Sequence, residues 1–110
     1  MAVRNLSVNI SIMSYSIEKI TQVVSAERYG DTAASISFLL TDSRSLCFPE
    51  ETLFFALHTD RNDGHHYIPE LYRRGVRNFV VENVPNNFSD LYKHANFLKV
   101  GNTLAAFQQL

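Results

Sequence analysis

The chain has 110 residues, a length that suits one domain around one hydrophobic core. Ten basic and eleven acidic residues nearly cancel, so no field of one sign would draw the chain to nucleic acid or to a membrane surface. Its single cysteine, Cys47, excludes an internal disulfide, and no apolar run is long enough to span a bilayer. We therefore expect a cytoplasmic protein without nucleic acid or membrane as a partner.

The first half of the chain predicts one helix and two strands. Apolar residues recur at helical spacing in residues 17–24, and Ser16 directly before them suits the N-cap. Residues 25–30 predict a short strand or a turn. Residues 35–44 are rich in β-branched and large apolar side chains and predict a strand. The apolar face of the helix is expected to contain Ile17, Ile20, Val23 and Val24.

The second half predicts strands that alternate with helices. The run "TLFFAL" (52–57) is apolar on both faces, as in a buried strand. A helix is expected over residues 66–74, with Gly75 as its stop and with Arg73 and Arg74 as solvated charges at its C-terminal end. A strand over residues 77–82, a turn with a short helix, and a strand over residues 96–100 follow.

This order predicts an α/β fold with a small mixed, largely parallel sheet and flanking helices. Two polar segments, "TDSR" (41–44) and "TDRNDGH" (59–65), follow the ends of apolar strands. Ligands of open α/β sheets bind beyond the carboxyl ends of the strands. A functional site is therefore expected where these two segments meet.

Neither a metal site nor a catalytic centre is expected in this chain. His65 and His66 are adjacent, so on a helix they diverge by about a hundred degrees, whereas zinc pairs on helices use i, i+4 spacing. Ser43 lacks the glycines of a nucleophile elbow, and Cys47 has no predicted basic partner. Because neither glycine-rich phosphate motif occurs, the chain is also expected to bind no ATP or dinucleotide cofactor.

The sequence leaves two roles open for Arg44 and Arg61, ligand binding and a purely structural role. Arg44 and Arg61 have a planar fork that suits the oxygens of a phosphate group. They are equally compatible with solvated surface charges, or with structural ion pairs to Asp42, Asp60 or Asp63. The position of both arginines in loops beyond strands favours a ligand, but the residues alone leave the choice open.

Two motifs in order, "TDSRSLCFPEETLFFAL" and "NDGHHYIPELYRRGVRNFVVE", resemble the N-terminal domain of the Mur ligases, in particular the E and F members. Those families carry D-S-R, a short turn, L-F-x-A-L, and then D-G-H-x-[FY]-I before a helix that ends in Gly. The segments "FFAL" and "NDGH" look closer to the F member. The resemblance covers about residues 14–110.

The resemblance implies a function. In these ligases the N-terminal domain holds the UDP part of a UDP-N-acetylmuramoyl-peptide. The central domain binds ATP and Mg²⁺ and makes an acyl phosphate, and the C-terminal domain brings the incoming amino acid or dipeptide. The F member adds D-alanyl-D-alanine to the UDP-N-acetylmuramoyl-tripeptide, and some of its relatives are fused to an alanine racemase. The expected partners are the UDP-N-acetylmuramoyl-peptide and the two other ligase domains.

The resemblance also assigns substrate-binding residues and no catalytic ones. One side of the nucleotide site would contain Thr41, Ser43 and Arg44, and the other would contain Thr59, Asp60, Arg61 and Asn62, with His65 beside it. Thr59 stands where the family usually has Gly. A loop that needed a positive φ at this position would be strained by a threonine.

The domain organisation follows from the same resemblance. Residues 1–12 are expected to be a loose tail, with Met13 as an alternative start, and residues 13–101 to form the substrate-binding domain. Residues 102–110 begin a helix, with Leu104 and Phe107 on one face, that would lead to an absent ATPase domain. The chain is thus interpreted as a fragment that is catalytically incomplete alone. The alternative is a non-catalytic α/β interaction or regulatory domain of the same fold.

Overall fold

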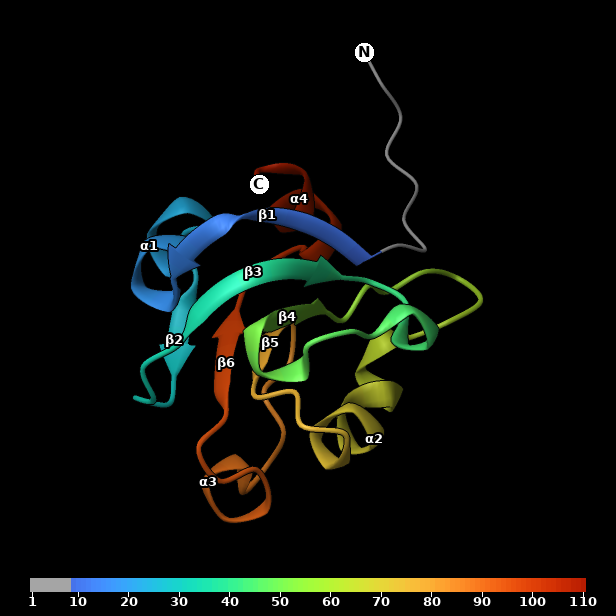
Figure 1. Ribbon diagram of the computed structural model, residues 1–110. Coiled ribbons are helices and arrows are strands. Elements are labelled where there is room, and N and C mark those ends of the chain that lie inside the picture. Colours follow the sequence, from blue (N-terminus) through green and yellow to red (C-terminus); the bar gives the residue numbers. More distant parts are fainter. Residues whose placement is uncertain (1–8) are drawn as a thin grey trace.

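Six strands form one sheet in the order β1-β3-β4-β5-β6-β2 in a computed structural model that describes residues 9–110 (Figure 1). The four central strands run parallel, and the edge strands β1 and β2 are antiparallel to β3 and β6. This confirms the predicted mixed, largely parallel sheet. The strands are β1 (Asn9–Ser16), β2 (Glu27–Tyr29), β3 (Ser35–Leu40), β4 (Thr52–Phe55), β5 (Asn78–Val81) and β6 (Asn96–Lys99).

Helices cover both faces of the sheet. In Figure 1, α1 and α4 lie on one face and α2 and α3 on the other. Three 3₁₀ turns, η1 to η3, lie in the connections around β4. The bounds are α1 (Ile17–Val23), η1 (Ser43–Ser45), η2 (Pro49–Glu51), η3 (Gly64–Tyr67), α2 (Ile68–Arg73), α3 (Phe88–Leu91) and α4 (Thr103–Gln108).

The core is divided by the sheet into two clusters. Successive side chains of a strand point to opposite faces, so Leu53 and Phe55 of β4 join the cluster under α1 and α4. Phe54 joins the cluster under α2, where its ring packs edge-on against Phe79 at a centroid distance of 6.4 Å. Because both faces of β4 are buried, the strand is apolar without alternation, as the sequence predicted.

The helix boundaries largely follow the expected caps, but two apolar residues are placed differently. The Ser16 side chain accepts a hydrogen bond from the Lys19 N–H, which confirms the predicted N-cap of α1. Val23, expected on the apolar face of α1, is 39 % exposed. In α4, Phe107 is fully buried, whereas Leu104, which was expected on the same face of the helix, is 37 % exposed.

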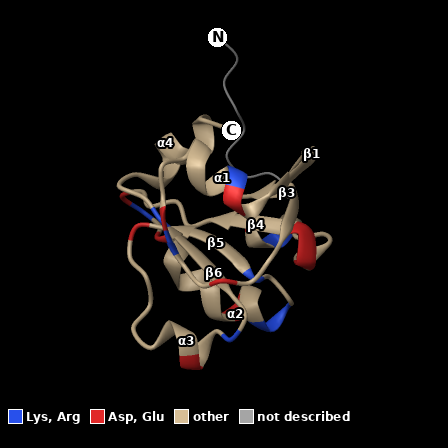
Figure 2. Ribbon diagram, turned by 90° about the vertical axis from the view of Figure 1, so that its left-hand side faces the viewer, with Lys and Arg blue, Asp and Glu red and all other residues tan. Residues whose placement is uncertain are grey.

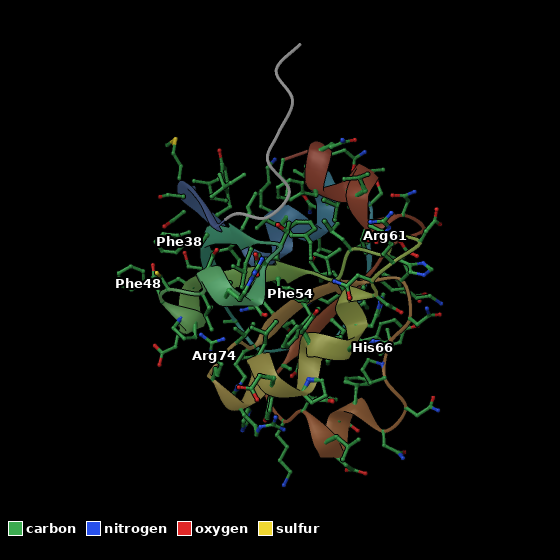
Figure 3. The ribbon with its side chains drawn as sticks, turned by 90° about the vertical axis from the view of Figure 1, so that its right-hand side faces the viewer. Phe38, Phe48, Phe54, Arg61, His66 and Arg74 are labelled. Carbon is green, nitrogen blue, oxygen red and sulfur yellow. The ribbon has the colours of Figure 1, made fainter. Side chains whose placement is uncertain are left out.

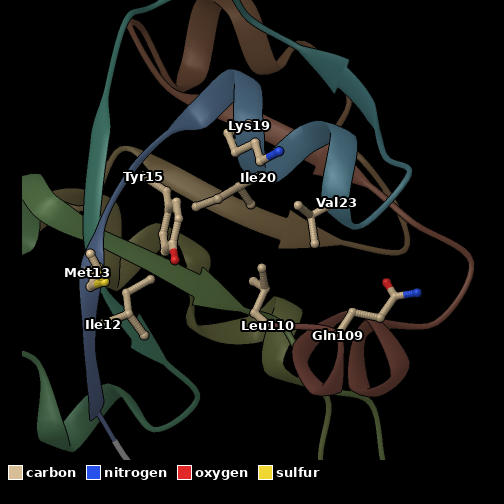
Figure 4. A pocket seen from close by; sticks show the side chains of 8 residues that line it. All are labelled: Ile12, Met13, Tyr15, Lys19, Ile20, Val23, Gln109 and Leu110. Atoms are coloured by element: carbon tan, nitrogen blue, oxygen red, sulfur yellow. The ribbon is translucent and has the colours of Figure 1, made fainter.

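The edge strand β1 begins at Asn9, inside the segment expected to be a loose tail. Residues 9–11 pair with the C-terminal end of β3, and residues 1–8 lie outside the part that the structure describes. A hollow of about 440 Å³ separates β1 from α1 and the end of α4, and Tyr15, Lys19 and Leu110 are among its lining residues (Figure 4).

Charged residues are spread over the molecule rather than gathered. Figure 2 shows basic and acidic segments interspersed on several elements, in keeping with ten basic and eleven acidic residues. Within residues 9–110, no helix is long and apolar enough to cross a membrane. The parallel arrangement of β3 to β6 brings the segments that follow these strands to one edge of the sheet, and both predicted site segments lie there.

Candidate functional site

The DSR turn (residues 42–44) follows β3 directly. Asp42 is the N-cap of η1, because its side chain accepts a hydrogen bond from the Arg44 N–H at 3.0 Å. The same carboxylate accepts hydrogen bonds from the Arg44 guanidinium: Nε donates to Oδ1 at 3.0 Å, and Nη2 donates to Oδ2 at 2.7 Å. The structural ion pair considered for Arg44 is thus present, and it fixes the guanidinium at the edge of the sheet.

The ion pair between Asp42 and Arg44 shifts the pKa of each side chain in the direction that favours its charged form. Hydrogen bonds from the Arg44 side chain and then from its backbone N–H lower the pKa of the Asp42 carboxyl. The same carboxylate raises the pKa of Arg44 above its already high value. Arg44 is nevertheless largely open to solvent, since 85 % of its side chain is exposed, against 14 % for Asp42.

Arg74 reaches the DSR turn from α2. Its Nη1 donates to the Ser43 carbonyl oxygen at 3.0 Å, so Arg74 is not the simple solvated charge that the sequence suggested. This bond ties the C-terminal end of α2 to η1 across the connection between β3 and β4. Arg61, in the loop before η3, lies well apart from Arg74, which follows the last residue of α2 (Figure 3).

The polar loop (residues 59–63) is closed by its own first residue. The Thr59 N–H donates to the Asn62 carbonyl oxygen at 2.8 Å, and the Asn62 N–H donates to Thr59 Oγ1 at 3.1 Å. Thr59 is absent from the positive-φ residues among residues 9–110, so a threonine fits where the related families carry glycine. Asp60 and Arg61 form the exposed tip of this turn.

Gly64 joins the polar loop to η3 by a close backbone approach. Its N–H donates to the Leu57 carbonyl oxygen at 2.7 Å, and a Cβ at this position would lie 2.8 Å from the Ala56 Cα. The preceding Asp63 caps η3 by accepting a hydrogen bond from the His65 N–H. That bond, followed by the one from the His65 ring, lowers the pKa of the Asp63 carboxyl against the effect of burial.

His65 connects η3 to the segment after β5. Its Nε2 accepts a hydrogen bond from the Glu82 N–H at 3.0 Å, so the proton of the neutral ring is assigned to Nδ1. Nδ1 then donates to Asp63 Oδ1 at 2.6 Å. With both ring nitrogens engaged by the protein, His65 acts as a structural bridge in this structure. It borders a separate hollow of about 580 Å³ that includes Asn83 and Pro85.

The structure brings together half of the predicted site residues. A hollow of about 330 Å³, called here the site pocket, is lined by Thr41, Asp42, Ser43, Arg44, Asn62 and Tyr67. Thr59, Asp60 and Arg61 lie in the adjoining loop but do not line the pocket, and His65 faces the other hollow. Sequence reasoning missed Tyr67, although it belongs to the quoted motif "DGHHYI".

Metal ligation was not expected, and no group of three or more His, Cys, Asp or Glu within residues 9–110 is arranged to hold a metal ion. Cys47 is exposed in the connection between β3 and β4. At this edge of the sheet, a polar pocket presents the Arg44 guanidinium, paired with Asp42, together with the Asn62 amide and the Tyr67 ring. This set suits recognition of a polar, partly planar ligand more than bond-making chemistry.

Comparisons with known proteins show what the chain is similar to. Over 88 residues, which are 79 % of the chain, the sequence is 34 % identical to a relative from Phocaeicola vulgatus named UDP-N-acetylmuramoyl-L-alanyl-D-glutamate–2,6-diaminopimelate ligase. No protein-family model matches the chain. The aligned part is 17 % of that relative, so the chain spans about one sixth of its length.

Solved structures share the fold. MurF from Acinetobacter baumannii has a TM-score of 0.73 at 23 % identity, over 92 % of this chain and 21 % of the MurF chain. A UDP-N-acetylmuramoylalanyl-D-glutamyl-2,6-diaminopimelate–D-alanyl-D-alanyl ligase from the same organism has a TM-score of 0.75 at 22 % identity, with the same coverage. The resemblance to the N-terminal domain of the Mur ligases is thereby confirmed, in sequence over 79 % of the chain and in fold over 92 %.

Proposed function

We propose that the chain is the UDP-N-acetylmuramoyl-peptide-binding domain of an ATP-dependent ligase of peptidoglycan synthesis. The site pocket is the observation that carries this proposal. Its two walls come from the two motifs that the related ligases carry, the DSR turn and the segment "NDGHHYI". Both motifs lie beyond the carboxyl ends of parallel strands, where α/β sheets bind their ligands.

The assignment of roles in the pocket follows from the contacts. Asp42 holds the Arg44 guanidinium, so Arg44 meets a ligand without first losing side-chain freedom. Arg61 stands exposed at the loop tip, where it is available to the diphosphate. The chain itself performs no amide-bond formation in this proposal. ATP and Mg²⁺ belong to a central domain of the parent protein.

We further propose that the parent adds D-alanyl-D-alanine to the UDP-N-acetylmuramoyl-tripeptide. The segments "FFAL" and "NDGH" and the shared fold with MurF support this choice. The sequence relative is instead named as a 2,6-diaminopimelate ligase. The two acceptor reactions therefore need to be compared in one experiment.

The test is an assay of the full-length parent with ATP and Mg²⁺. We expect ADP and a new amide product with UDP-N-acetylmuramoyl-tripeptide and D-alanyl-D-alanine, and none with UDP-N-acetylmuramoyl-dipeptide and 2,6-diaminopimelate. If product forms only in the second mixture, the substrate-binding role stands, and the acceptor is 2,6-diaminopimelate rather than D-alanyl-D-alanine. Absence of product in both mixtures would contradict the proposed ligase.

A further inference from the structure

The His65 ring joins the polar-loop side of the site pocket to the segment that follows β5. On one side, its Nδ1 donates to Asp63 Oδ1 at 2.6 Å. On the other side, its Nε2 accepts a hydrogen bond from the Glu82 N–H at 3.0 Å, and the Asn83 N–H approaches the same nitrogen at 3.4 Å. Only 16 % of the His65 side chain is exposed, so water competes little for these bonds.

The Glu82 side chain continues this connection to α4. Its Oε2 accepts hydrogen bonds from the Thr103 N–H at 2.9 Å and from Thr103 Oγ1 at 3.1 Å. Thr103 is the first residue of α4 and is almost fully buried. Because the first N–H groups of a helix have no partner within the helix, the Glu82 carboxylate satisfies a donor that would otherwise be buried without one. Hydrogen bonds therefore link the polar loop to α4 through His65 and Glu82.

This connection depends on the protonation state of His65. A neutral imidazole has one donor nitrogen and one acceptor nitrogen, whereas an imidazolium has two donors and no acceptor. With Nδ1 donating to Asp63, Nε2 is the only ring nitrogen that can accept the Glu82 N–H. A protonated ring can keep its bond to Asp63 as an ion pair, but it would direct an N–H group at the N–H of Glu82. The bond to Glu82 must then break.

The titratable groups around the ring leave His65 as the group that changes this bond at mildly acidic pH. Hydrogen bonds from the His65 backbone and then from its ring lower the pKa of the Asp63 carboxyl, so Asp63 stays ionised there. His58 faces Asp63 through an isolated β-bridge and lies one segment away from the ring. The Glu82 carboxylate is turned toward Thr103, and α4 contains no titratable side chain. The hollow beside the ring is completed by Ile68 and Pro69 of α2 and by Tyr92 after α3.

We propose that neutral His65 is a positioning residue that couples the polar-loop side of the site pocket to the first turn of α4, and that protonation of its ring opens this connection at the Glu82 N–H. The inference goes beyond the proposed function, because it concerns the chain without any ligand. It assigns His65 a role other than contact with a substrate.

The test is an NMR titration of the isotope-labelled chain from about pH 8 to about pH 5, the range in which histidine side chains ordinarily change charge. We expect a scalar coupling across the hydrogen bond between His65 Nε2 and the Glu82 amide nitrogen at high pH, and its loss as the ring is protonated. The amide signals of Glu82 and Asn83 should shift with the midpoint of the His65 ring, and that of Thr103 should follow. Absence of the coupling at high pH, or a ring that stays neutral to pH 5, would overturn the proposal.

Three variants identify the groups responsible. His65→Gln has no titrating ring and should lose the pH-dependent shifts of Glu82 and Asn83. His66→Gln, an exposed neighbour in η3, is the matched control and should keep them. Glu82→Ala retains the backbone N–H but lacks the carboxylate, so residues 82 and 83 should still respond to pH while Thr103 no longer does. If His65→Gln is poorly folded, the coupling in the original chain decides the question alone.

The contrary outcomes are equally specific. Shifts of Glu82 and Asn83 that persist in His65→Gln, or that vanish in His66→Gln, would show that another group controls this segment. A Thr103 response that is unchanged in Glu82→Ala would show that the connection to α4 does not run through Glu82. Either result overturns the proposal and leaves the proposed function untouched, since no nucleotide is present in the experiment.

Discussion

Gly64 is the residue at which the polar loop, η3 and the end of β4 meet. A methyl group there would lie 2.8 Å from both the Ala56 Cα and the Leu57 nitrogen, and backbone atoms cannot move aside cheaply. We predict that Gly64→Ala lowers the free energy of unfolding by about 1–3 kcal/mol, the usual cost of overpacking. Urea unfolding of the purified chain measures this.

Gly101 supplies the matched control. A Cβ at Gly101 meets no atom within 4 Å, and its φ is not in the left-handed region. Gly101→Ala should therefore leave the stability unchanged or raise it by a few tenths of a kcal/mol, up to about 1 kcal/mol. Equal destabilisation by both substitutions would mean that the close approach at Gly64 is not the cause.

Asp63 makes the stability of this segment depend on pH. Its pKa is lowered in the folded chain from the ordinary value of 3.8, because the carboxylate accepts hydrogen bonds from the His65 backbone and ring. A lowered folded pKa stabilises the fold above the unfolded pKa, and that stabilisation is lost as the pH falls through the folded pKa. Asp63→Asn should remove this pH-dependent part of the free energy of unfolding.

The measurement compares urea midpoints of the two proteins from pH 7 down to about pH 3. We expect the variant to be less stable at neutral pH and the gap to close below pH 3.8. Asp60→Asn, at the exposed loop tip, should follow the original chain throughout. A gap that stays constant with pH would show that Asp63 contributes only as a cap.

At the residue scale, motif position predicted which segments lie together at the edge of the sheet, but not the contacts that each side chain makes. The sequence predicted Arg44 as a site residue, and Arg44 lines the site pocket, but only coordinates show that Asp42 holds its guanidinium. Thr59 was assigned to the ligand, whereas its hydroxyl closes the polar loop. Such roles depend on which way a side chain turns within an irregular segment, and no periodicity in the sequence reports this.

At the scale of elements, α4 packs on the sheet through Phe107, and its first residue, Thr103, donates hydrogen bonds to the Glu82 carboxylate. Phe107 is fully buried and packs edge-on against Phe55 of β4 at a centroid distance of 5.2 Å. Phe107→Ala should lower the free energy of unfolding by about 3–5 kcal/mol. Leu104→Ala, on the exposed side of the same helix, should change it by about 0.5 kcal/mol or less, as measured by urea unfolding. Equal losses would contradict the burial described for α4.

Strands with both faces buried were the easiest elements to predict. β4 and β5 are apolar after their first residues, Thr52 and Asn78, and each strand lies within the predicted range. β1 was missed although its segment alternates polar and apolar residues, because the alternation changes phase between Ile12 and Met13, where the register with β3 shifts. The parallel link from β3 to β4 was also unusual, since it contains 3₁₀ turns and no α-helix.

For the whole molecule, the fold separates stability from recognition. The two core clusters fill the centre of both layers, while the site pocket lies in loops beyond the sheet. Arg61→Ala should therefore weaken binding of UDP by about 1–3 kcal/mol, the value of a charge-assisted hydrogen bond, with little change in unfolding. Calorimetry or NMR titration measures the affinity.

Arg73→Ala is the control for Arg61. Arg73 is exposed at the other end of the η3–α2 segment and pairs with Glu70 on its own helix. Its removal should leave UDP binding unchanged. Arg74 is unsuitable for this purpose because it bonds the Ser43 carbonyl next to the pocket. Unchanged binding by Arg61→Ala would remove Arg61 from the substrate site.

The most direct test of the substrate-binding role is titration of the chain with UDP-N-acetylmuramoyl-tripeptide, followed by NMR amide shifts. The account predicts weak saturable binding, with the largest shifts in residues 41–44 and 59–67, where the two motifs form the site pocket. Shifts confined to the hollow between β1, α1 and α4, or no shifts at millimolar substrate, would contradict it.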